Sequence, residues 1–388
     1  MNIILIVLFI LNAFIIFWAM IGYPISLKKI DKYSKRPNIV KNYDYEPTVT
    51  IMIVAHNEEK VIFDKLVNVT QVNYPKSKLE ILISSDNSKD KTNKIVREFI
   101  NNNHEYNIRM YEVKERKGKT NAQNEAAATV KSNILIMTDA NAMLDQNSIK
   151  ELVSAFATDD IAYVTGRLKY TNADEEWTSE SESSYWEFDL KMREVESKLH
   201  LVTAGNGALY ACKIEDYYNF DPINSHDSSM PKHYVLLGKR AIYNKDAIAY
   251  ERAGAIVEDE FGRKVRMSRS ILSALFPDIN LFNVFKYNWF SYCFFGHRYC
   301  RNNLWLAHVL VFLFNIPLAF TNLFFLISLV AQVLFYLIAL IKHITKVENK
   351  IVNMIYYYSI TIIAQIFGAY RQLTGKSKPF WEKAESTR

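Results

Sequence analysis

Three long runs without a charged residue dominate the hydrophobic pattern of this chain. They cover residues 1–27, 304–341 and 351–370. A helix needs about 20 apolar residues to cross a bilayer, so each run is long enough, and the second is long enough for two passes. We therefore predict a transmembrane anchor over 1–27 and several transmembrane segments within 304–370. The alternative interpretation is that these runs are buried helices of a soluble protein.

The residues after the first run decide between an anchor and a cleaved signal peptide. A signal peptide carries its basic residues before a shorter apolar stretch. Here they follow the run, at Lys28, Lys29, Lys32, Lys35 and Arg36. Basic residues beside a membrane segment favour the cytosolic side. The pattern predicts a multi-pass protein of the cell membrane whose polar middle region is cytosolic. Basic residues beyond 370 favour a cytosolic tail as well, which a re-entrant last segment would allow.

The polar middle region begins with β-rich runs that alternate with amphipathic helical stretches. Strands are expected at 49–54, 79–84, 108–113, 134–138 and 161–165. Helices are expected at 58–69, 91–102, 120–130 and 148–156. This alternation is typical of parallel strands joined by crossover helices. It predicts an α/β domain of the nucleotide-binding type, in which ligands bind at the carboxyl ends of the strands.

Two later segments also show a helical pattern. Between residues 179 and 200, apolar side chains recur every three or four residues, at Tyr185, Phe188, Met192, Val195 and Leu199. We expect this face to pack into the core. Residues 281–300 alternate aromatic side chains with Lys286, His297 and Arg298. This alternation predicts an amphipathic segment in the membrane interface, with its aromatic residues inward and its cations outward.

Composition and charge restrict the classes of function. The chain has 388 residues, of which 49% are hydrophobic, and a formal net charge of +6. The basic residues gather beside the membrane segments, so membrane lipid is an expected partner and nucleic acid is not. Cys212, Cys293 and Cys300 lack the spacing of a metal site and are expected to remain reduced in the cytosol.

Four polar motifs lie at the ends of expected strands or at the start of an expected helix. They cover residues 54–59, 85–92, 116–120 and 138–141. Each has an ordinary structural explanation, because Asn, Asp and Ser favour caps and turns and a basic turn is readily solvated. Helix N-termini at strand ends also bind phosphates, however, and carboxylate and amide oxygens suit a hard divalent cation. Their shared position favours a site for a nucleotide and a metal ion.

The order of these motifs resembles that of family 2 glycosyltransferases, over about residues 47–269. The resemblance implies that Ala55, Asn57 and Glu58, in the first motif, contribute to the donor site. It implies that Asp86 accepts a hydrogen bond from the base edge of the nucleotide. Lys119, in the third motif, is then expected to lie along the bound nucleotide sugar.

The same resemblance assigns the rest of the donor site. Asn124 would lie along the donor beside Lys119. Asp139 and Asn141 take the places of the family's two metal-binding acids, with an amide in place of the second carboxylate. They are expected to hold Mg2+ or Mn2+ together with the donor diphosphate.

Two downstream stretches resemble the acceptor half of the same family. Asp227 occupies the position of the catalytic base, which takes the proton of the acceptor hydroxyl, and His226 replaces its usual acidic neighbour. Arg266 keeps the family's arginine beside the departing diphosphate. Arg263 replaces a glutamine and is expected to contact the donor, and Met267 replaces a tryptophan. Because the tryptophan would form an aromatic platform for a sugar, Met267 argues against chain-extending synthesis.

The resemblance implies an α/β, GT-A-like fold flanked by transmembrane helices. Residues 48–165 would form the nucleotide-sugar half, 166–275 the acceptor half and 281–300 the interfacial segment. The expected reaction transfers a sugar from a nucleoside diphosphate sugar, most plausibly a UDP-sugar, to a lipid-linked or growing glycan acceptor with inversion. A membrane scaffold that binds nucleotide sugar without turnover is the main alternative. A transporter is disfavoured because the three runs contain no charged residue.

Overall fold

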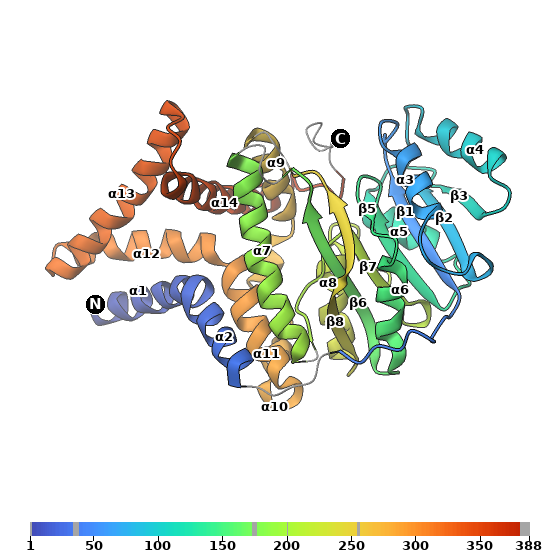
Figure 1. The fold of residues 1–388 in the computed structure, drawn as a ribbon. Helices are drawn as coiled ribbons and strands as arrows, with labels where there is room; N and C mark the ends of the chain where they lie inside the picture. The colour runs from blue at the N-terminus through green and yellow to red at the C-terminus, as the bar shows by residue number, and fades with distance from the viewer. Residues whose placement is uncertain (1, 34–38, 173–176, 200, 254–256, 381–388) are drawn as a thin grey trace.

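The chain folds into an α/β domain with long helices extending from one side (Figure 1). The computed structural model describes residues 2–33, 39–172, 177–199, 201–253 and 257–380. An eight-stranded sheet forms the centre of the domain, in the order β3-β2-β1-β4-β7-β6-β8-β5. The strands are β1 (Val49–Ala55), β2 (Leu79–Ser85), β3 (Asn107–Glu112), β4 (Ile134–Asp139), β5 (Met143–Leu144), β6 (Ile161–Tyr170), β7 (Leu209–Lys213) and β8 (Arg240–Glu251).

The first half of the sheet confirms the expected parallel strands. β1 pairs in parallel with β2 and β4, and β2 pairs in parallel with β3. β6 runs in the same direction as β4, as expected, but it does not pair with β4. β7 lies between β4 and β6 and is antiparallel to both, while β8 pairs in parallel with β6. The sheet is therefore mixed, because the chain turns back at residues 201–208 and inserts β7 beside β4.

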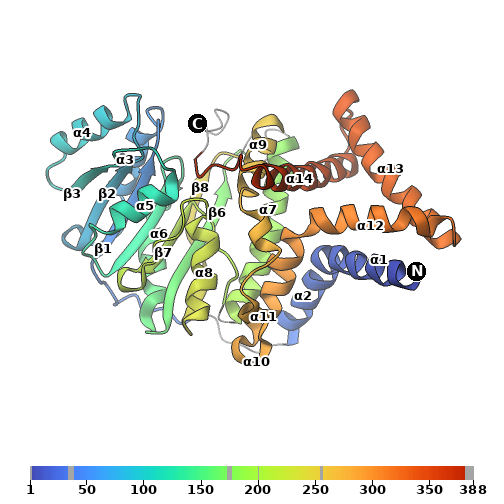
Figure 2. The ribbon, with the colours of Figure 1, turned by 180° about the vertical axis from the view of Figure 1, so that it is seen from behind.

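Alternate side chains of the strands point to opposite faces of the sheet, and each face has its own core. Val49, Ile51 and Ile53 of β1 pack with α3 (Ile62–Thr70), α4 (Thr92–Asn102) and α6 (Ser148–Ser154). Met52 packs on the other side, which α5 (Lys119–Ala127) and α8 (His226–Leu236) cover (Figure 2). Each fully buried aliphatic side chain contributes about 1.5–3 kcal/mol. The two cores hold the strand ends in fixed positions.

The helix α7 (Trp177–Lys198) separates the sheet from the long helices (Figure 1). Of its expected apolar face, Met192 and Leu199 are buried, whereas Phe188 is exposed. The α7 side chains that are buried also include charged ones, which the apolar pattern did not predict. The helix α9 (Val257–Met267) follows β8 and packs against the last long helix, through the rings of Phe261 and Phe367.

The segment expected to form one interfacial helix is divided into shorter pieces. They are a 3-10 turn (Ile279–Phe282), α10 (Val284–Tyr287), α11 (Trp289–Cys293) and a π-helical turn (Phe294–Cys300). Phe290 and Phe294 are buried, as expected for inward aromatic residues, and Phe285 is exposed. The outward placement of His297 is wrong, because its side chain is 3% exposed. Two carboxylates on α7 supply hydrogen-bond partners that a burial pattern does not reveal.

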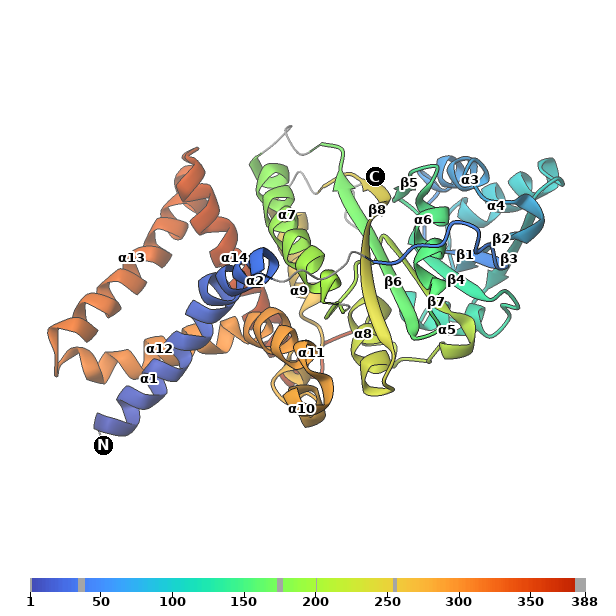
Figure 3. The ribbon, with the colours of Figure 1, turned by 60° about the horizontal axis from the view of Figure 1, so that its bottom comes forward.

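The long helices are α1 (Asn2–Phe17), α2 (Tyr23–Tyr33), α12 (Leu304–Ala319), α13 (Leu323–Thr345) and α14 (Lys350–Leu373). In the described part of the chain, three helical stretches are long and apolar enough to cross a membrane: Ile3–Tyr33, Leu323–Thr345 and Lys350–Leu373. α12 reaches this length only together with Trp289–Cys300, from which it is bent by 63°. Figure 3 shows α12, α13 and α14 as the sides of a triangle.

Candidate active site

The carboxyl ends of β1, β2 and β4 bring three of the sequence motifs to one edge of the sheet. Ala55 lies opposite Ser85, and Val54 lies opposite Asp139. The backbone carbonyl of Ala55 accepts a hydrogen bond of 2.9 Å from the amide of Asp86. We call this edge the donor edge. The structure therefore brings together motifs that are up to about 80 residues apart in the sequence.

Two asparagines form the turns of the donor edge. Asn57 and Asn87 have φ angles of 55° and 54°, in the left-handed region that asparagine tolerates better than most residues. The side-chain oxygen of Asn57 accepts from the amide of Lys89 at 2.7 Å, and the amide of Glu58 donates to Thr92 Oγ1 at 2.7 Å. The predicted donor-site residues of the first motif thus bind the second motif and hold the two loops together.

Asp86 lies beneath the loop that contains the third motif. Its carboxylate accepts hydrogen bonds from the amides of Lys117 at 3.2 Å and Gly118 at 3.0 Å. Burial raises the pKa of Asp86 above its usual value, although these amides favour the charged form. The buried Asp86 carboxylate thus fixes the backbone of that loop at the donor edge.

The C-terminal segment packs on the same loop. Gly118 has a φ of +95°, and a Cβ placed on it would lie 2.5 Å from the carbonyl oxygen of Pro379. The guanidinium of Arg116 lies 4.8 Å from the ring centroid of Phe380. Residues just beyond α14 therefore reach the donor edge, a contact that the sequence did not indicate.

The predicted metal-binding residues lie at the end of β4. Asp139 Oδ1 forms an ion pair with the ammonium of Lys119, and Lys119 Nζ also donates to the carbonyl of Gly207 at 3.4 Å. Asn141 Nδ2 donates to Glu251 Oε1 at 2.7 Å. Glu251, at the end of β8, was not identified in the sequence, because nothing near it forms a motif.

The side chains at this point fit a divalent cation that shares its coordination with a diphosphate. Among the described residues, no group of three or more His, Cys, Asp or Glu side chains is arranged to hold a metal ion. Hard cations such as Mg2+ are commonly held by one or two protein oxygens together with substrate phosphates and water. Asp139 offers a carboxylate, and the Asn141 amide offers its oxygen because its nitrogen faces Glu251. The donor set is therefore partial but chemically suitable.

A buried lysine supports the loop that contains Asp139 and Asn141. Lys65 is 0% exposed, and its ammonium donates to Thr138 Oγ1 at 3.0 Å and to the carbonyl of Ala142. Burial lowers the pKa of Lys65 to about 7, while the charges of Asp139 and Glu251 oppose the shift. Sequence reasoning missed Lys65, although a signal exists. It occupies the same helical face as the buried residues Ile62, Leu66 and Val69.

The predicted base, Asp227, lies in the first turn of α8 on the far side of this loop region. Its backbone carbonyl accepts a hydrogen bond of 2.7 Å from the amide of Gly205. The N-terminal end of a helix stabilises a carboxylate. Burial lowers the pKa of Arg269, and the nearby charge of Asp227 opposes that shift. Asp227 therefore has a cationic neighbour from the segment after α9.

His226 and Asn124 connect α8 to α5 instead of facing the donor edge. His226 is 1% exposed, and its Nε2 lies 3.0 Å from Asn124 Oδ1. Burial, followed by the charge of Lys119, lowers the pKa of His226 to about 3, so the ring is neutral at physiological pH. Asn124 Nδ2 donates to the carbonyl of Phe220 at 2.8 Å. The Asn124 amide thus contacts protein through both of its polar atoms.

Arg266 and Arg263 lie on α9 and have different surroundings. Burial and then the charges of Arg263 and Arg269 lower the pKa of Arg266 to about 10, while Asp139 and Glu251 oppose the shift. Arg266 is therefore close to the loop that contains Asp139. Arg263 donates to the carboxylate of Glu260 at 2.6 and 2.9 Å. The structure brings Arg266 to the end of β4 and pairs Arg263 within α9.

Residues 50–216 match the family model "Glycosyl transferase family 2". The chain is 34% identical over 142 residues to a probable glycosyltransferase, YdaM, of Bacillus subtilis. This match covers 35% of this chain and 33% of YdaM. It is 29% identical over 140 residues to a poly-beta-1,6-N-acetyl-D-glucosamine synthase of Staphylococcus aureus. This match covers 36% of this chain and 32% of the synthase. The matched segment thus spans about a third of the length of these curated relatives.

A solved structure resembles nearly the whole chain. It is the mannosyltransferase PcManGT from Pyrobaculum calidifontis, in complex with GDP-Man and Mn2+. The two structures superpose with a TM-score of 0.72 at 21% sequence identity, over 96% of this chain and 99% of that one. This similarity establishes the fold. Residues 50–216 are thus similar in sequence to family 2 glycosyltransferases, and the α/β domain has a GT-A-like fold.

Proposed function

We propose that this protein transfers a sugar from a nucleoside diphosphate sugar, most plausibly a UDP-sugar, to a lipid-linked or growing glycan acceptor. One observation carries the proposal: Asp86 and Asp139 lie at the ends of the two strands that flank β1, and the loop at 204–208 joins that edge to Asp227. Nucleotide recognition, diphosphate binding and proton transfer would then occur around one loop.

In this mechanism each part of the site has a separate task. Asp86 recognises the base edge, and Lys119 lies along the diphosphate. A divalent cation, Mg2+ or Mn2+, held by Asp139 and Asn141 would neutralise diphosphate charge when bound. Asp227 takes the proton of the acceptor hydroxyl as that hydroxyl attacks the anomeric carbon from the face opposite the leaving nucleotide. Because attack and departure occur on opposite faces, the configuration inverts.

The role of the two arginines follows from their contacts. Arg266, beside Asp139, is suited to offset the charge that develops on the departing diphosphate. Arg263 was expected to contact the donor. Its ion pair lies within α9, with Glu260, which also accepts from Tyr357 of α14, so we propose that Arg263 supports the packing of α9 on α14. The side chain of Met267 is 59% exposed and offers no aromatic platform. We therefore propose that the products are short.

The position of the C-terminal segment supports a membrane topology. Pro379 and Phe380 contact the loop that contains Arg116 and Gly118, so residues 379–380 lie on the same side of the membrane as the α/β domain. An even number of the helices α12, α13 and α14 must then cross. α14 is the candidate to lie along the membrane, because it packs on α9 and its Tyr357 hydroxyl donates to Glu260 at 2.9 Å. We propose that α1 anchors the chain and that the α/β domain is cytosolic.

A screen of nucleotide sugars tests the proposal. Full-length protein in lipid nanodiscs is incubated with a panel of UDP- and GDP-sugars, with and without a metal chelator, and both binding and released nucleotide are measured. We expect one donor class to bind and to turn over, with turnover lost in chelator and restored by Mg2+ or Mn2+. Binding without turnover under any condition would instead favour a scaffold that binds nucleotide sugar. Asn141, in place of an acid, is the reason to consider this alternative. No binding of any donor would refute both.

A further inference from the structure

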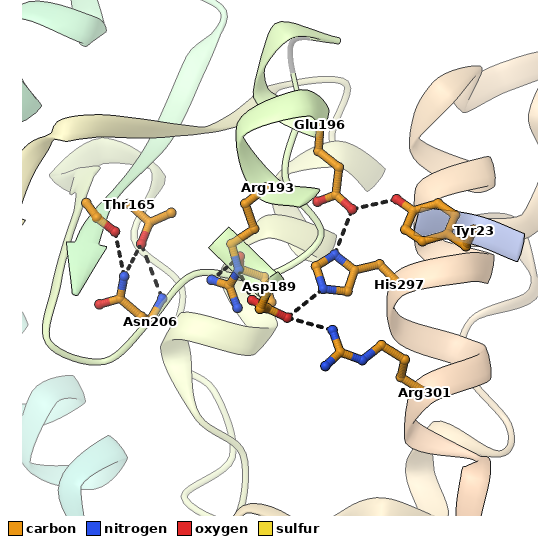
Figure 4. A network of polar contacts seen from close by, with 10 residues as sticks. Tyr23, Thr165, Asp189, Arg193, Glu196, Asn206, His297 and Arg301 are labelled. Carbon is orange, nitrogen blue, oxygen red and sulfur yellow. Dashed lines mark hydrogen bonds and ion pairs between the residues drawn. The ribbon is translucent and has the colours of Figure 1, made fainter. Parts of the chain in front are cut away.

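A buried group of charged side chains joins the long helices to the α/β domain outside the donor edge (Figure 4). We call it the α7 network. Glu196 accepts hydrogen bonds from the Tyr23 hydroxyl at 2.6 Å and from His297 Nδ1 at 2.7 Å. Asp189 accepts from His297 Nε2 at 2.8 Å and from Arg301 at 2.7 Å. Its members come from α2, α7 and the turn before α12, which are distant in the sequence.

The geometry of the α7 network defines its charge state. Both ring nitrogens of His297 face carboxylate oxygens, and ionised carboxylates only accept hydrogen bonds, so His297 is the doubly protonated imidazolium. Burial acts to raise the pKa of Asp189, but Arg193, His297 and Arg301 outweigh it and hold that pKa well below its usual value. The network is therefore a set of mutually compensated charges inside the protein.

Arg193 extends the α7 network into the active site. Its Nε donates to Asp189 Oδ2 at 2.6 Å, and its Nη1 donates to the backbone carbonyl of Ala204 at 2.9 Å. Arg193 is 4% exposed. The planar guanidinium can make both bonds at once in a fixed geometry, which an ammonium cannot reproduce. The network thus ends on the backbone of residues 204–208, a segment that we call the central loop.

The central loop contacts the start of α8, the start of α5 and the end of β4. The Gly205 amide binds the carbonyl of Asp227 at 2.7 Å. The Gly207 carbonyl accepts from Lys119, the partner of Asp139. The Ala208 carbonyl accepts from Thr138 Oγ1 at 2.7 Å, next to Asp139.

The central loop has little freedom to shift. A Cβ on Gly205 would lie 1.8 Å from the hydroxyl of Tyr163. Asn206 donates to the carbonyl of Gly166 at 2.5 Å and accepts from the amide of Ala208 at 3.1 Å, and Figure 4 shows it beside Thr165. A loop that is packed this closely passes a displacement at Ala204 on to its neighbours.

We propose that Arg193 is a positioning residue, through which the membrane-anchored helices hold the central loop, and with it Asp227 and Lys119, in the geometry for sugar transfer. Hydrophobic residues often replace buried ion pairs without loss of stability. Stability alone therefore requires neither these charges nor their contact with the central loop. The bond from Arg193 to the Ala204 carbonyl gives the network a direct connection to the site. The turnover measurement described below rests on the proposed sugar transfer, and the hydrogen-exchange measurement does not.

The experiment compares two network variants with a matched control in nanodiscs. Arg193→Lys keeps the charge but cannot make both bonds, and Tyr23→Phe removes one hydroxyl at the far end of the network. Tyr292→Phe is the control, because its ring packs against Tyr23 while its hydroxyl contacts Ser26 and no charged member of the network. Turnover, donor affinity and amide hydrogen exchange over residues 203–208 are measured for each.

A misplacement of about 1 Å can cost about 10²-fold in rate, so we expect turnover to fall by about 10-fold or more in Arg193→Lys and by a few-fold in Tyr23→Phe. Donor affinity should stay near wild type, exchange in the central loop should rise in both variants, and Tyr292→Phe should change neither. The double variant should lose less than the product of the two single effects, because both act through one network.

Unchanged exchange in the central loop of both variants would overturn the proposal, as would equal losses in Tyr23→Phe and Tyr292→Phe. If wild-type protein shows no turnover with any donor, the proposed function fails, and the exchange measurement still decides whether Arg193 controls the central loop. If Arg193→Lys does not fold, Tyr23→Phe carries the test, because it removes a single oxygen atom and keeps the ring.

Discussion

The donor edge and the α7 network both gather charged side chains, but they use charge in opposite ways. At the donor edge, the side chains of Lys119 and Asp139 are 24% and 31% exposed. In the α7 network, Asp189 is 5% and Glu196 0% exposed, and each carboxylate has more than one partner. Exposed charges at strand ends are available to a ligand, whereas buried and compensated charges fix one arrangement of the surrounding helices.

This difference teaches how to separate binding residues from positioning residues. The charges of Lys119 and Asp139 remain partly solvated, and each can exchange its protein partner for a phosphate or a metal ion. A charge that holds two elements together is desolvated, and removal of its partner leaves an uncompensated buried charge that destabilises the fold. The central loop lies between the two regions, and it links them only through backbone groups. Substitutions in the two regions should therefore affect different measurements.

The largest expected effect separates activity from stability. Asp139→Ala should reduce turnover to the detection limit, because the metal and the donor diphosphate lose their carboxylate. It should leave the thermal midpoint close to wild type, since its ion pair is partly solvated. Arg193→Met should instead cost about 3–5 kcal/mol in unfolding free energy, because it leaves Asp189 buried with fewer partners. Activity assays and thermal melts of both variants check the contrast.

Two outcomes would break this contrast. One is a large loss of stability in Asp139→Ala, and the other is an Arg193→Met protein as stable as wild type. Asn141→Asp sharpens the prediction, because it restores a second carboxylate and should keep activity. An inactive but folded Asn141→Asp would show that the amide has a separate function beside Glu251.

An intermediate effect concerns pH and the buried neutral His226. Its pKa is about 3 in the folded protein, below the usual 6.5, so the unfolded chain binds a proton that the folded protein does not. The stability that the neutral ring contributes is complete above pH 6.5 and falls between pH 6.5 and about 3, by up to about 1.4 kcal/mol per pH unit. His226→Asn should flatten this part of the curve of melting temperature against pH. Identical slopes for variant and wild type would contradict the burial of a neutral ring.

The smallest expected effect concerns the C-terminal segment. Phe380→Ala removes the ring beneath Arg116, a contact worth about 0.5–1 kcal/mol at exposed sites, so donor affinity should fall by about 2- to 5-fold. Turnover at saturating donor should change little, because the segment contacts the loop that contains Arg116 and Gly118 and not Asp227. Titration with the preferred nucleotide sugar measures the shift. An increase in affinity would mean that the segment competes with the donor.

The sequence was sufficient to predict the donor edge because its determinants are local. Each strand is a short apolar run, and each functional residue follows the end of a run, as Asp86 and Asp139 do. Parallel pairing then brings these ends together without further information. The position of β7 was not predicted. Its antiparallel pairing with β4 depends on the turn at Gly205 and Gly207, which interrupts the apolar pattern.

The residues that sequence reasoning missed act through contacts between distant segments. Glu251 meets Asn141 only because β8 ends beside the β4 loop, and His297 is buried only because α7 offers two carboxylates. No periodicity within either segment reports such a partner. Lys65 is different, because a lysine on the apolar face of α3 was visible in the sequence and indicates a buried amine that needs acceptors.

Asp227→Asn tests the central claim most directly, because it keeps the shape of the base and removes its capacity to accept a proton. Turnover should fall by about 10²-fold or more, while donor affinity stays near wild type. Asp221→Asn, on the preceding exposed loop, is the matched control and should keep full turnover. Near-normal turnover in Asp227→Asn, or a parallel loss of donor binding, would contradict the assignment of Asp227 as the base.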